Sequence, residues 1–267
     1  MEDRKALKNK KKIVIKIGTS SLTHPGGRVN FESFKQLTRV VADLQNSGRK
    51  CILVSSGAIA VGCGKLNREN RPETLAGKQA VAAIGQAELI RIYQDFFNDY
   101  SHIVAQVLLT KDVIDDPEKC SNAKNTLNTL IRMNIIPVIN ENDTVATDEI
   151  IYGDNDRLSA DVAALVEADL LIILSDIDGL FSADPHKHPD AEIISKVTAI
   201  TPEIEQIASG SNSVFARGGM ATKIAAVKTC FAHHIDAVIM NSNNPSLILR
   251  LLEGQNIGTY FCADPKK

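Results

Sequence analysis

Acidic and amide side chains are concentrated in one stretch, from Asn140 to Asp156 (NENDTVATDEIIYGDND), which contains no Lys or Arg. Its carboxylates belong to Glu141, Asp143, Asp148, Glu149, Asp154 and Asp156. So many acids repel one another unless a cationic ligand, a metal or a distant lysine neutralises them. Because Asn140 and Asn155 can both donate and accept hydrogen bonds, the stretch suits recognition of a small zwitterion. A solvated acidic loop is the alternative interpretation.

Two glycine-containing turns follow apolar runs in the first part of the chain. In KIGTS, Lys16 lies between two isoleucines of an expected strand, so it either points out of the sheet or serves an anion. Gly18 would let backbone N–H groups approach a phosphate. In SSGA, Ser56 and Gly57 would turn the chain into a helix whose N-terminal N–H groups can hold an anion. A serine helix cap explains the second turn nearly as well.

Two further turns occur in the second half of the chain. Ser175 and Asp176 open the loop SDIDGLFSADP after an apolar run and could contact a ribose or an adenine edge, although a plain turn would look similar. The segment RGGMATK, from Arg217 to Lys223, places two glycines before a helix and a lysine one turn into it. Bare N–H groups with a mobile cation suit a nucleotide triphosphate. The segment is not a Walker A loop, because GxxxxGK[ST] is absent.

Other chemistries find little support in the sequence. There is no GxSxG turn for a serine hydrolase, no GxGxxG fingerprint and no His/Cys cluster spaced for a metal. The parts that are present favour phosphoryl transfer, in which a protein positions the reactants and neutralises charge. Two lysines from opposite halves of the chain would bracket the phosphoryl group, a carboxylate would aim them, and Mg²⁺ would bridge phosphate oxygens.

The elements expected to position these residues alternate between strand and helix, which predicts an α/β fold with a mostly parallel sheet and helices on both faces. Apolar runs predict strands at 12–18, 51–54, 103–109, 135–139, 170–174, 192–197, 237–240 and 259–262. Helical periodicity predicts helices at 31–48, 80–97, 122–133, 158–167, 220–233 and 245–252. No repeat or linker interrupts the pattern, so we expect one compact unit.

Composition limits the partners and the compartment. The 267 residues are 44% hydrophobic, enough for a sizeable core, and the net charge of -2 gives no reason to invoke nucleic acid or an acidic membrane. No apolar run approaches the roughly 18 residues that span a bilayer. The five cysteines are an odd number without CxxC spacing, which favours a reducing, cytoplasmic location. The Lys-rich residues 1–11 suggest a frayed basic tail.

Seven motifs that carry these residues occur in a set order: KIGTSSL, LVSSGAIAVG, KQAVAAIGQ, IIPVINENDTVAT, YGDNDRLSA, LSDIDGLFSADP and GGMATK. Together they resemble the amino acid kinase family, and INEND with GDND resembles those members that phosphorylate glutamate. The resemblance implies a three-layer αβα sandwich around a mainly parallel sheet of about eight strands. It also implies ATP- and Mg²⁺-dependent phosphorylation of the γ-carboxylate of L-glutamate, the first step of proline biosynthesis.

The resemblance assigns roles by position. Lys16, Asp156 and Lys223 would be catalytic, with Asp156 orienting the two lysines around the phosphoryl group. The residues that would bind glutamate are Ser56, Gly57, Asn140, Asp143 and Asn155. The residues that would bind the nucleotide are Lys16, Gly18, Ser175, Asp176, Arg217, Gly218, Gly219, Met220, Ala221, Thr222 and Lys223. The metal ligands are left unassigned.

The resemblance also carries expectations about organisation and partners. Residues 12–267 would form a single domain, with the glutamate site in its N-terminal half and the ATP site in its C-terminal half. The RNA-binding-type PUA domain of many family members would be absent, because the chain ends too soon. A homodimer or homotetramer, feedback inhibition by proline and a glutamyl phosphate reductase as pathway partner are expected. Arg217 departs from the small residue common at its position.

Two alternatives remain beside this interpretation. Acetylglutamate kinase, aspartokinase, carbamate kinase and uridylate kinase would share the Lys and Gly elements but not INEND with GDND. A nucleotide-binding regulatory protein could keep the same fold without turnover. ATP consumption that depends on glutamate would separate these classes.

Overall fold

A computed structural model of the chain describes residues 3–68, 70–146, 155–185, 187–209 and 219–263. Its centre is an eight-stranded sheet in the order β3-β4-β2-β1-β5-β7-β8-β6. The strands are β1 (Lys12–Ile17), β2 (Lys50–Ser55), β3 (Val104–Leu109), β4 (Ile136–Glu141), β5 (Leu170–Ser175), β6 (Lys196–Val197), β7 (Asp236–Asn241) and β8 (Thr259–Phe261). Neighbouring strands are parallel except for the antiparallel pair β7 and β8.

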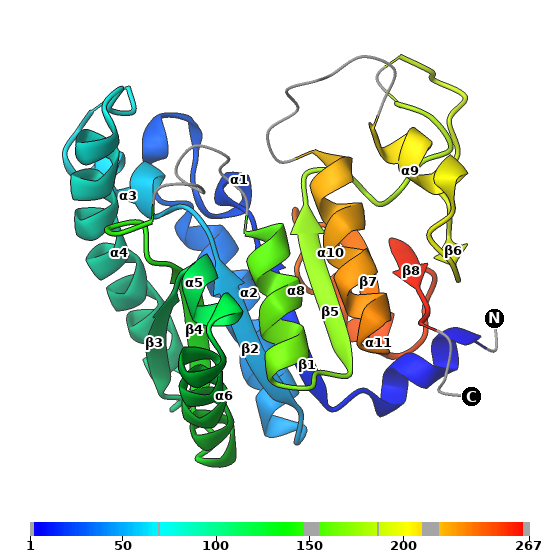
Figure 1. Cartoon of the computed structure of the whole chain (residues 1–267), viewed down its shortest axis with the longest axis horizontal. Coiled ribbons are helices and arrows are strands. Elements are labelled where there is room, and N and C mark those ends of the chain that lie inside the picture. Colours follow the sequence, from blue (N-terminus) through cyan, green and yellow to red (C-terminus); the bar gives the residue numbers. More distant parts are fainter. Residues whose placement is uncertain (1–2, 69, 147–154, 186, 210–218, 264–267) are drawn as a thin grey trace.

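Helices cover both faces of the sheet, so the predicted αβα sandwich is confirmed (Figure 1). One face packs on α2 (Phe31–Asn46), α4 (Leu75–Asn98) and α11 (Leu247–Leu252). The other face packs on α6 (Pro117–Arg132), α8 (Asp156–Leu165) and α10 (Met220–Ala232). Shorter elements are η1 (Asp3–Asn9), α1 (Thr19–Leu22), η2 (Pro25–Gly27), α3 (Ala58–Lys65), α5 (Lys111–Asp115) and α9 (Pro202–Ser209).

The alternation of side chains along β1 explains the two cores. Ile13, Ile15 and Ile17 are fully buried in the core on the α2, α4 and α11 side. Val14 belongs to the core on the α6, α8 and α10 side. Because successive side chains point to opposite faces of a strand, Lys16 shares the face of Val14 and is directed toward the layer of α8 and α10.

The structure corrects several predicted boundaries. The strand expected at 192–197 contains only Lys196–Val197, because just these two positions pair with β8. An isolated bridge between Phe181 and Ile193 is the only other pairing found for that stretch within the described residues. The helices α3 and α9 were not predicted; α3 contains two glycines, which weaken its helical pattern.

The N-terminal residues do not form the frayed basic tail that the sequence suggested. Residues 3–9 form a 3₁₀-helix, and the Arg4 guanidinium donates hydrogen bonds to the carbonyl oxygens of Ser195, Gln255, Ile257 and Gly258. Leu7 is fully buried. The tail is ordered because these four carbonyls accept from a charged donor that is itself only 7% exposed.

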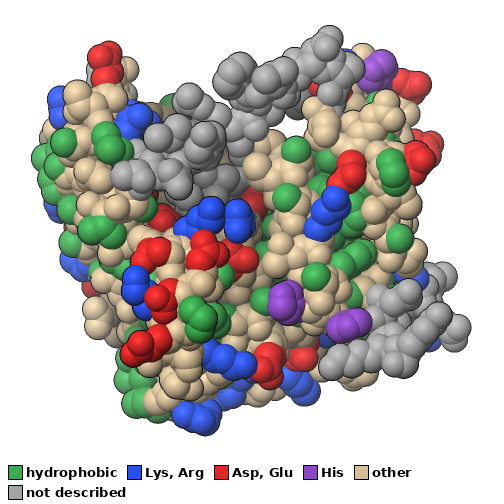
Figure 2. Space-filling model, in the orientation of Figure 1, with side chains coloured by type: hydrophobic (Ala, Val, Ile, Leu, Met, Phe, Trp, Pro, Cys, Tyr) green, Lys and Arg blue, Asp and Glu red, His purple; other side chains and the backbone are tan. Residues whose placement is uncertain are grey.

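Charges of both signs are mixed on the surface drawn in Figure 2. Over α5 and α6, acidic and basic side chains are interspersed, and several form ion pairs such as Lys119 with Asp112 and Lys124 with Glu167. Exposed pairs of this kind contribute little to stability, at most about 1 kcal/mol each. Within the described residues, no helix has both the length and the apolar character needed to cross a membrane.

Candidate active site

Two adjoining cavities open at the edge of the sheet where β1, β2 and β5 end. They have volumes of about 640 Å³ and 570 Å³, and Ser175, Asp176 and Lys223 line both. On one side of β1 lie β2, β4 and β3, which come early in the chain, and on the other side lie β5, β7, β8 and β6, which come later. The strand order therefore reverses at β1, and the cavities open at the carboxyl end of this strand. Ligands of open α/β sheets bind at such a point. Each volume suits a small ligand.

A buried charge cluster adjoins the cavities: Lys16 lines the first and Lys223 lines both. The carboxylate of Asp156 lies with Oδ1 2.6 Å from Lys16 Nζ and with Oδ2 3.2 Å from Lys223 Nζ. Asp156 is fully buried, and the two lysines are 4% and 6% exposed. The structure therefore brings together the three residues that were predicted to be catalytic, and the distant lysines neutralise at least this carboxylate of the acidic stretch.

Each member of the cluster comes from a rigid element. Lys16 lies near the end of the central strand β1, while Asp156 is the first residue of α8 and Lys223 is in the first turn of α10. A carboxylate in the first turn of a helix is favoured by the helix dipole. Thr222 Oγ1 donates to Asp156 Oδ2 at 2.8 Å. Thr222, which we expected at the nucleotide, therefore contacts the carboxylate of Asp156.

The three charged groups of this cluster lie in a place from which water is largely excluded. Removing a charge from water costs several kcal/mol per ion unless partners compensate it. Both lysine side chains line the first cavity, so an anion that enters it can reach their ammonium groups. The arrangement is thus prepared for a negatively charged group such as a phosphoryl group.

The turn after β2 forms another wall of the first cavity. Ser56 lines that cavity, and its backbone N–H donates to the carbonyl oxygen of Ile17, which joins this turn to the end of β1. Gly57 follows with φ of 100°, a left-handed conformation that L side chains rarely adopt. It is the residue before α3, so the glycine is required for the tight passage from strand to helix.

Asn140 and Asn155 bind each other rather than facing the cavity. Asn155 Nδ2 donates to Asn140 Oδ1 and to the carbonyl oxygen of Ser55, both at 2.7 Å. Asn140 Nδ2 donates to Gln86 Oε1 at 2.6 Å. Neither asparagine is among the described residues that line the two cavities. Their buried network instead supports the end of β2, directly before Ser56.

Asp143 is in the turn that follows β4. Burial raises the pKa of its carboxyl group to about 6, because a charged carboxylate is poorly solvated there. Like the two asparagines, it is not among the described residues lining the cavities. Its neighbours at 147–154, which include Asp148, Glu149 and Asp154, lie outside the described residues.

The second cavity is formed by the loop after β5 and the start of α10. Asp178, Phe181, Gly219 and Met220 line it together with the shared residues, whereas Ala221 does not. Asn241 Nδ2, at the end of β7, donates to Asp178 Oδ1 at 2.7 Å. Of the predicted nucleotide positions, Ser175, Asp176, Gly219, Met220 and Lys223 thus converge on this cavity, whereas Thr222, like Ala221, does not line it. Arg217 and Gly218 lie outside the described residues.

Magnesium would have to be held largely by its ligand's phosphates. Among the described residues there is no group of three or more His, Cys, Asp or Glu side chains arranged to hold a metal. Mg²⁺ keeps several waters and commonly needs only one or two carboxylates in addition to substrate phosphates. Asp176 fits this requirement, because it is exposed and lines both cavities.

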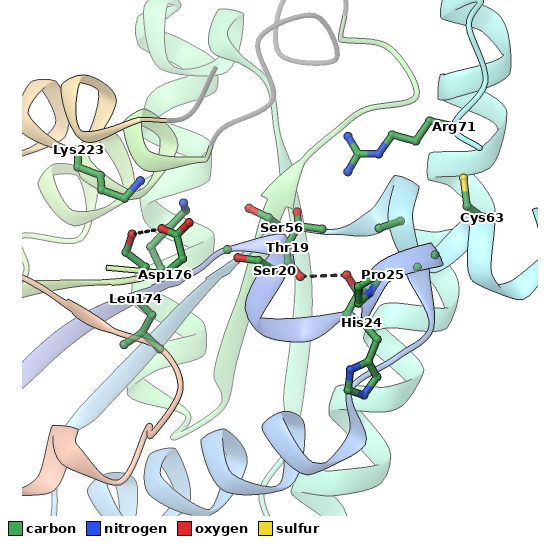
Figure 3. Close-up of a pocket in the computed structure, with 17 residues that line it drawn as sticks. Thr19, Ser20, His24, Pro25, Ser56, Cys63, Arg71, Leu174, Asp176 and Lys223 are labelled. Carbon is green, nitrogen blue, oxygen red and sulfur yellow. Dashed lines mark hydrogen bonds between the residues drawn. The ribbon is translucent and has the colours of Figure 1, made fainter. Parts of the chain in front are cut away.

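Several residues around the first cavity were not predicted from the sequence. They are Thr19, Ser20, Thr23, His24, Cys63 and Arg71, and Figure 3 shows most of them around the opening. Thr19 and Ser20 directly follow Gly18, which also lines this cavity, so the glycine turn was a usable signal for them. Arg71 stands in an irregular connection with no periodic pattern, and nothing in its local sequence marked it.

Comparison with known proteins identifies the family. A sequence profile of the amino acid kinase family matches residues 11–241. The glutamate 5-kinase of Clostridium perfringens (strain 13 / Type A) is 50% identical over 264 residues, which are 97% of this chain and 98% of that protein. The glutamate 5-kinase of Enterococcus faecalis (strain ATCC 700802 / V583) is 48% identical over 262 residues, with 97% of each chain covered.

Solved structures share the fold at low sequence identity. A carbamate kinase from Giardia lamblia bound to AMP-PNP superposes with a TM-score of 0.68 and 18% identity, covering 96% of this chain and all of that one. An isopentenyl phosphate kinase from T. acidophilum gives a TM-score of 0.63 at 16% identity, covering 94% and 99%. With the match along nearly its whole length to glutamate 5-kinases, the chain belongs to the amino acid kinase family.

Proposed function

We propose that this chain catalyses ATP-dependent phosphorylation of the γ-carboxylate of L-glutamate, giving L-glutamyl 5-phosphate in the first step of proline biosynthesis. The observation that carries the proposal is the buried cluster of Lys16, Asp156 and Lys223, whose lysines line two adjoining cavities of ligand size. The sequence relatives, at about half identity over nearly the whole chain, support glutamate as the acceptor.

The acceptor needs no general base in this reaction. A γ-carboxyl group has an ordinary pKa near 4.3, so it is already ionised at neutral pH and attacks the γ-phosphorus of ATP directly. Negative charge then spreads over the equatorial oxygens of the transferring group. Lys16 and Lys223 stabilise that charge from two sides, while Asp156 holds both ammonium groups in place. The bond to the β-phosphate oxygen breaks, and ADP leaves.

The first cavity takes glutamate and the second takes the nucleotide. Ser56 and the backbone around Gly57 contact the acceptor. The network of Asn140 and Asn155 holds this turn in place through the carbonyl oxygen of Ser55. Asp143 supplies negative charge for the α-ammonium group. Ser175, Asp176 and the start of α10 bind ATP. Asp176, together with the phosphates of ATP, would hold Mg²⁺, which would supply positive charge against the phosphate oxygens.

A coupled ADP-release assay with Mg·ATP tests the reaction. It offers L-glutamate, N-acetyl-L-glutamate, L-aspartate and UMP as separate acceptors, with hydroxylamine present to trap an acyl phosphate. We expect turnover and hydroxamate with L-glutamate alone. Turnover with another acceptor instead would keep the fold and reject the substrate. A folded protein that binds ATP but is silent with all four would favour a regulatory role.

The remaining expectations about organisation are proposals as well. We treat residues 12–267 as one catalytic domain, whose N-terminal half binds glutamate and whose C-terminal half binds ATP. We further propose a homodimer or homotetramer, inhibition by proline at the glutamate site, and a reductase that consumes the acyl phosphate. A cytoplasmic location is proposed on the cysteine pattern. Sedimentation at several concentrations and inhibition by proline at rising glutamate test the first two.

A further inference from the structure

Arg71 lines the first cavity on the side away from Lys223, which we call the acceptor end (Figure 3). It belongs to the connection between α3 and α4 and lines the cavity together with Ser56, Ala60 and Cys63. In Figure 3 its guanidinium group extends from this connection over the opening, with Ser56 between it and Lys223. The side chain is exposed, so a ligand that enters the cavity can meet it directly.

The connection that carries Arg71 is held at both of its ends. At the first, the backbone N–H of Arg68 donates to the carbonyl oxygen of Cys63 at 2.9 Å. At the second, Thr74 caps α4 by accepting from the backbone N–H of Gly77 at 3.2 Å. Pro72 follows Arg71 and restricts the arginine to extended backbone conformations. These constraints limit the positions that the guanidinium group can occupy.

Among the basic side chains that line the first cavity, Arg71 is available to bind an anionic group of the ligand. Lys16 and Lys223 line the same cavity but are both paired with Asp156. Arg71 forms no salt bridge with any residue that the structure describes. Glutamate carries two carboxylates. The γ-carboxylate must lie at the two lysines for transfer to occur, and the α-carboxylate then lies a short aliphatic chain away from them.

We propose that Arg71 binds the α-carboxylate of the acceptor and thereby selects for an amino acid with a free α-carboxyl group. This assignment rests on the proposed glutamate kinase activity. A guanidinium group offers parallel N–H donors that match both oxygens of a carboxylate, which a lysine cannot reproduce. Because the α-carboxylate does not react, the contact is the same in the ground state and the transition state. Its loss should therefore raise KM and leave kcat nearly unchanged.

The test compares L-glutamate with L-isoglutamine, in which the α-carboxylate is replaced by an amide and the γ-carboxylate is kept. Both are measured with the unaltered chain, Arg71→Ala, Arg71→Lys and the control Arg68→Ala, an exposed arginine of the same connection that does not line the cavity. If isoglutamine is not turned over, its inhibition constant against glutamate replaces its KM. The KM for ATP is recorded for every variant.

We expect Arg71→Ala to raise the glutamate KM about tenfold or more, the range for a hydrogen bond to a charged group. The values for isoglutamine should stay within about a factor of two, so the preference for glutamate should collapse. Arg71→Lys should recover part of it, and Arg68→Ala should behave as the unaltered chain. An unchanged preference for glutamate in Arg71→Ala, or a rise confined to the KM for ATP, would overturn the role assigned to Arg71 but not the proposed kinase activity. No glutamate turnover by the unaltered chain would reject the proposed function itself.

Discussion

The two ends of the first cavity are built in different ways. At the proposed transfer end, Lys16, Asp156 and Lys223 come from a strand and two helices, and all are nearly inaccessible to solvent. At the proposed acceptor end, Arg71 comes from an irregular connection and is exposed. Groups that stabilise transition-state charge work best when fixed in a place without water, whereas groups that admit a substrate must be reachable. The buried end should therefore govern kcat, and the exposed end should govern KM.

Removing the carboxylate should break the transfer end most severely. Asp156→Asn removes the carboxylate that pairs with two buried ammonium groups, which should lower the free energy of unfolding by about 3–5 kcal/mol. The lysines also lose their common anchor, so we expect kcat to fall by a factor of about 10³. Urea unfolding and ADP release measure the two effects. Asp95→Asn, on the surface of α4, should change neither; wild-type kcat in Asp156→Asn would contradict the assigned role.

Removing Lys16 tests whether the transfer end acts on kcat rather than on the glutamate KM. Lys16→Ala should lower kcat by about 10²–10³, the cost of losing one electrostatic donor, with little change in the glutamate KM. Lys12→Ala serves as the control, because Lys12 lies in the same strand but its Nζ donates to the carbonyl oxygen of Val166 away from the cavity. If the Lys16 variant instead has a normal kcat and a raised glutamate KM, the roles that we assign to the two ends of the cavity are reversed.

The asparagine network supports the end of β2 directly before Ser56, and its loss should have an intermediate effect. Asn155→Ala leaves the Ser55 carbonyl oxygen and Asn140 Oδ1 without a donor from residue 155, which should cost about 1–3 kcal/mol of stability. Because the Ser56 turn loses its support, the glutamate KM should rise more than kcat falls. Thermal unfolding and steady-state kinetics measure this; a fall in kcat with unchanged KM would assign Asn155 to the transfer end.

The smallest effect concerns pH at the acceptor side. Below its pKa of about 6, Asp143 is protonated and cannot attract the α-ammonium group of glutamate. The glutamate KM should therefore rise as the pH falls through 6, and Asp143→Asn should show a raised KM that is insensitive to pH. Initial rates between pH 5 and 8 test this, with ranges chosen around that pKa.

The same group has a predictable effect on stability. Since burial raises the pKa of Asp143 above its unfolded value, the charged form destabilises the fold, and this cost appears as the pH rises through the folded pKa. Asp143→Asn should thus be the more stable protein at pH 7. The difference should vanish below about pH 4, where the unfolded chain also holds the proton. Urea unfolding at both pH values measures it.

Local patterns were sufficient for most of the fold. Apolar runs separated by helical periods identified every strand of the sheet, because the hydrophobic period reports which faces of an element are buried. Boundaries were less certain where that signal is weak: the predicted strand at 192–197 contains only two paired residues, and the glycines of α3 obscured its helix. The N-terminal helix was missed because its order depends on Arg4 and four carbonyl oxygens from distant segments.

By itself, the sequence determined that Lys16 occupies a strand beside a glycine turn, that Asp156 precedes a helix, and that Lys223 is one turn into another. Only the tertiary structure decided that these residues meet around one carboxylate, that Asn140 and Asn155 bind each other, and that Arg71 reaches the same cavity. The physical reason is that residue order and period describe each element alone. Which elements become neighbours depends on the crossovers that place β1 between β2 and β5.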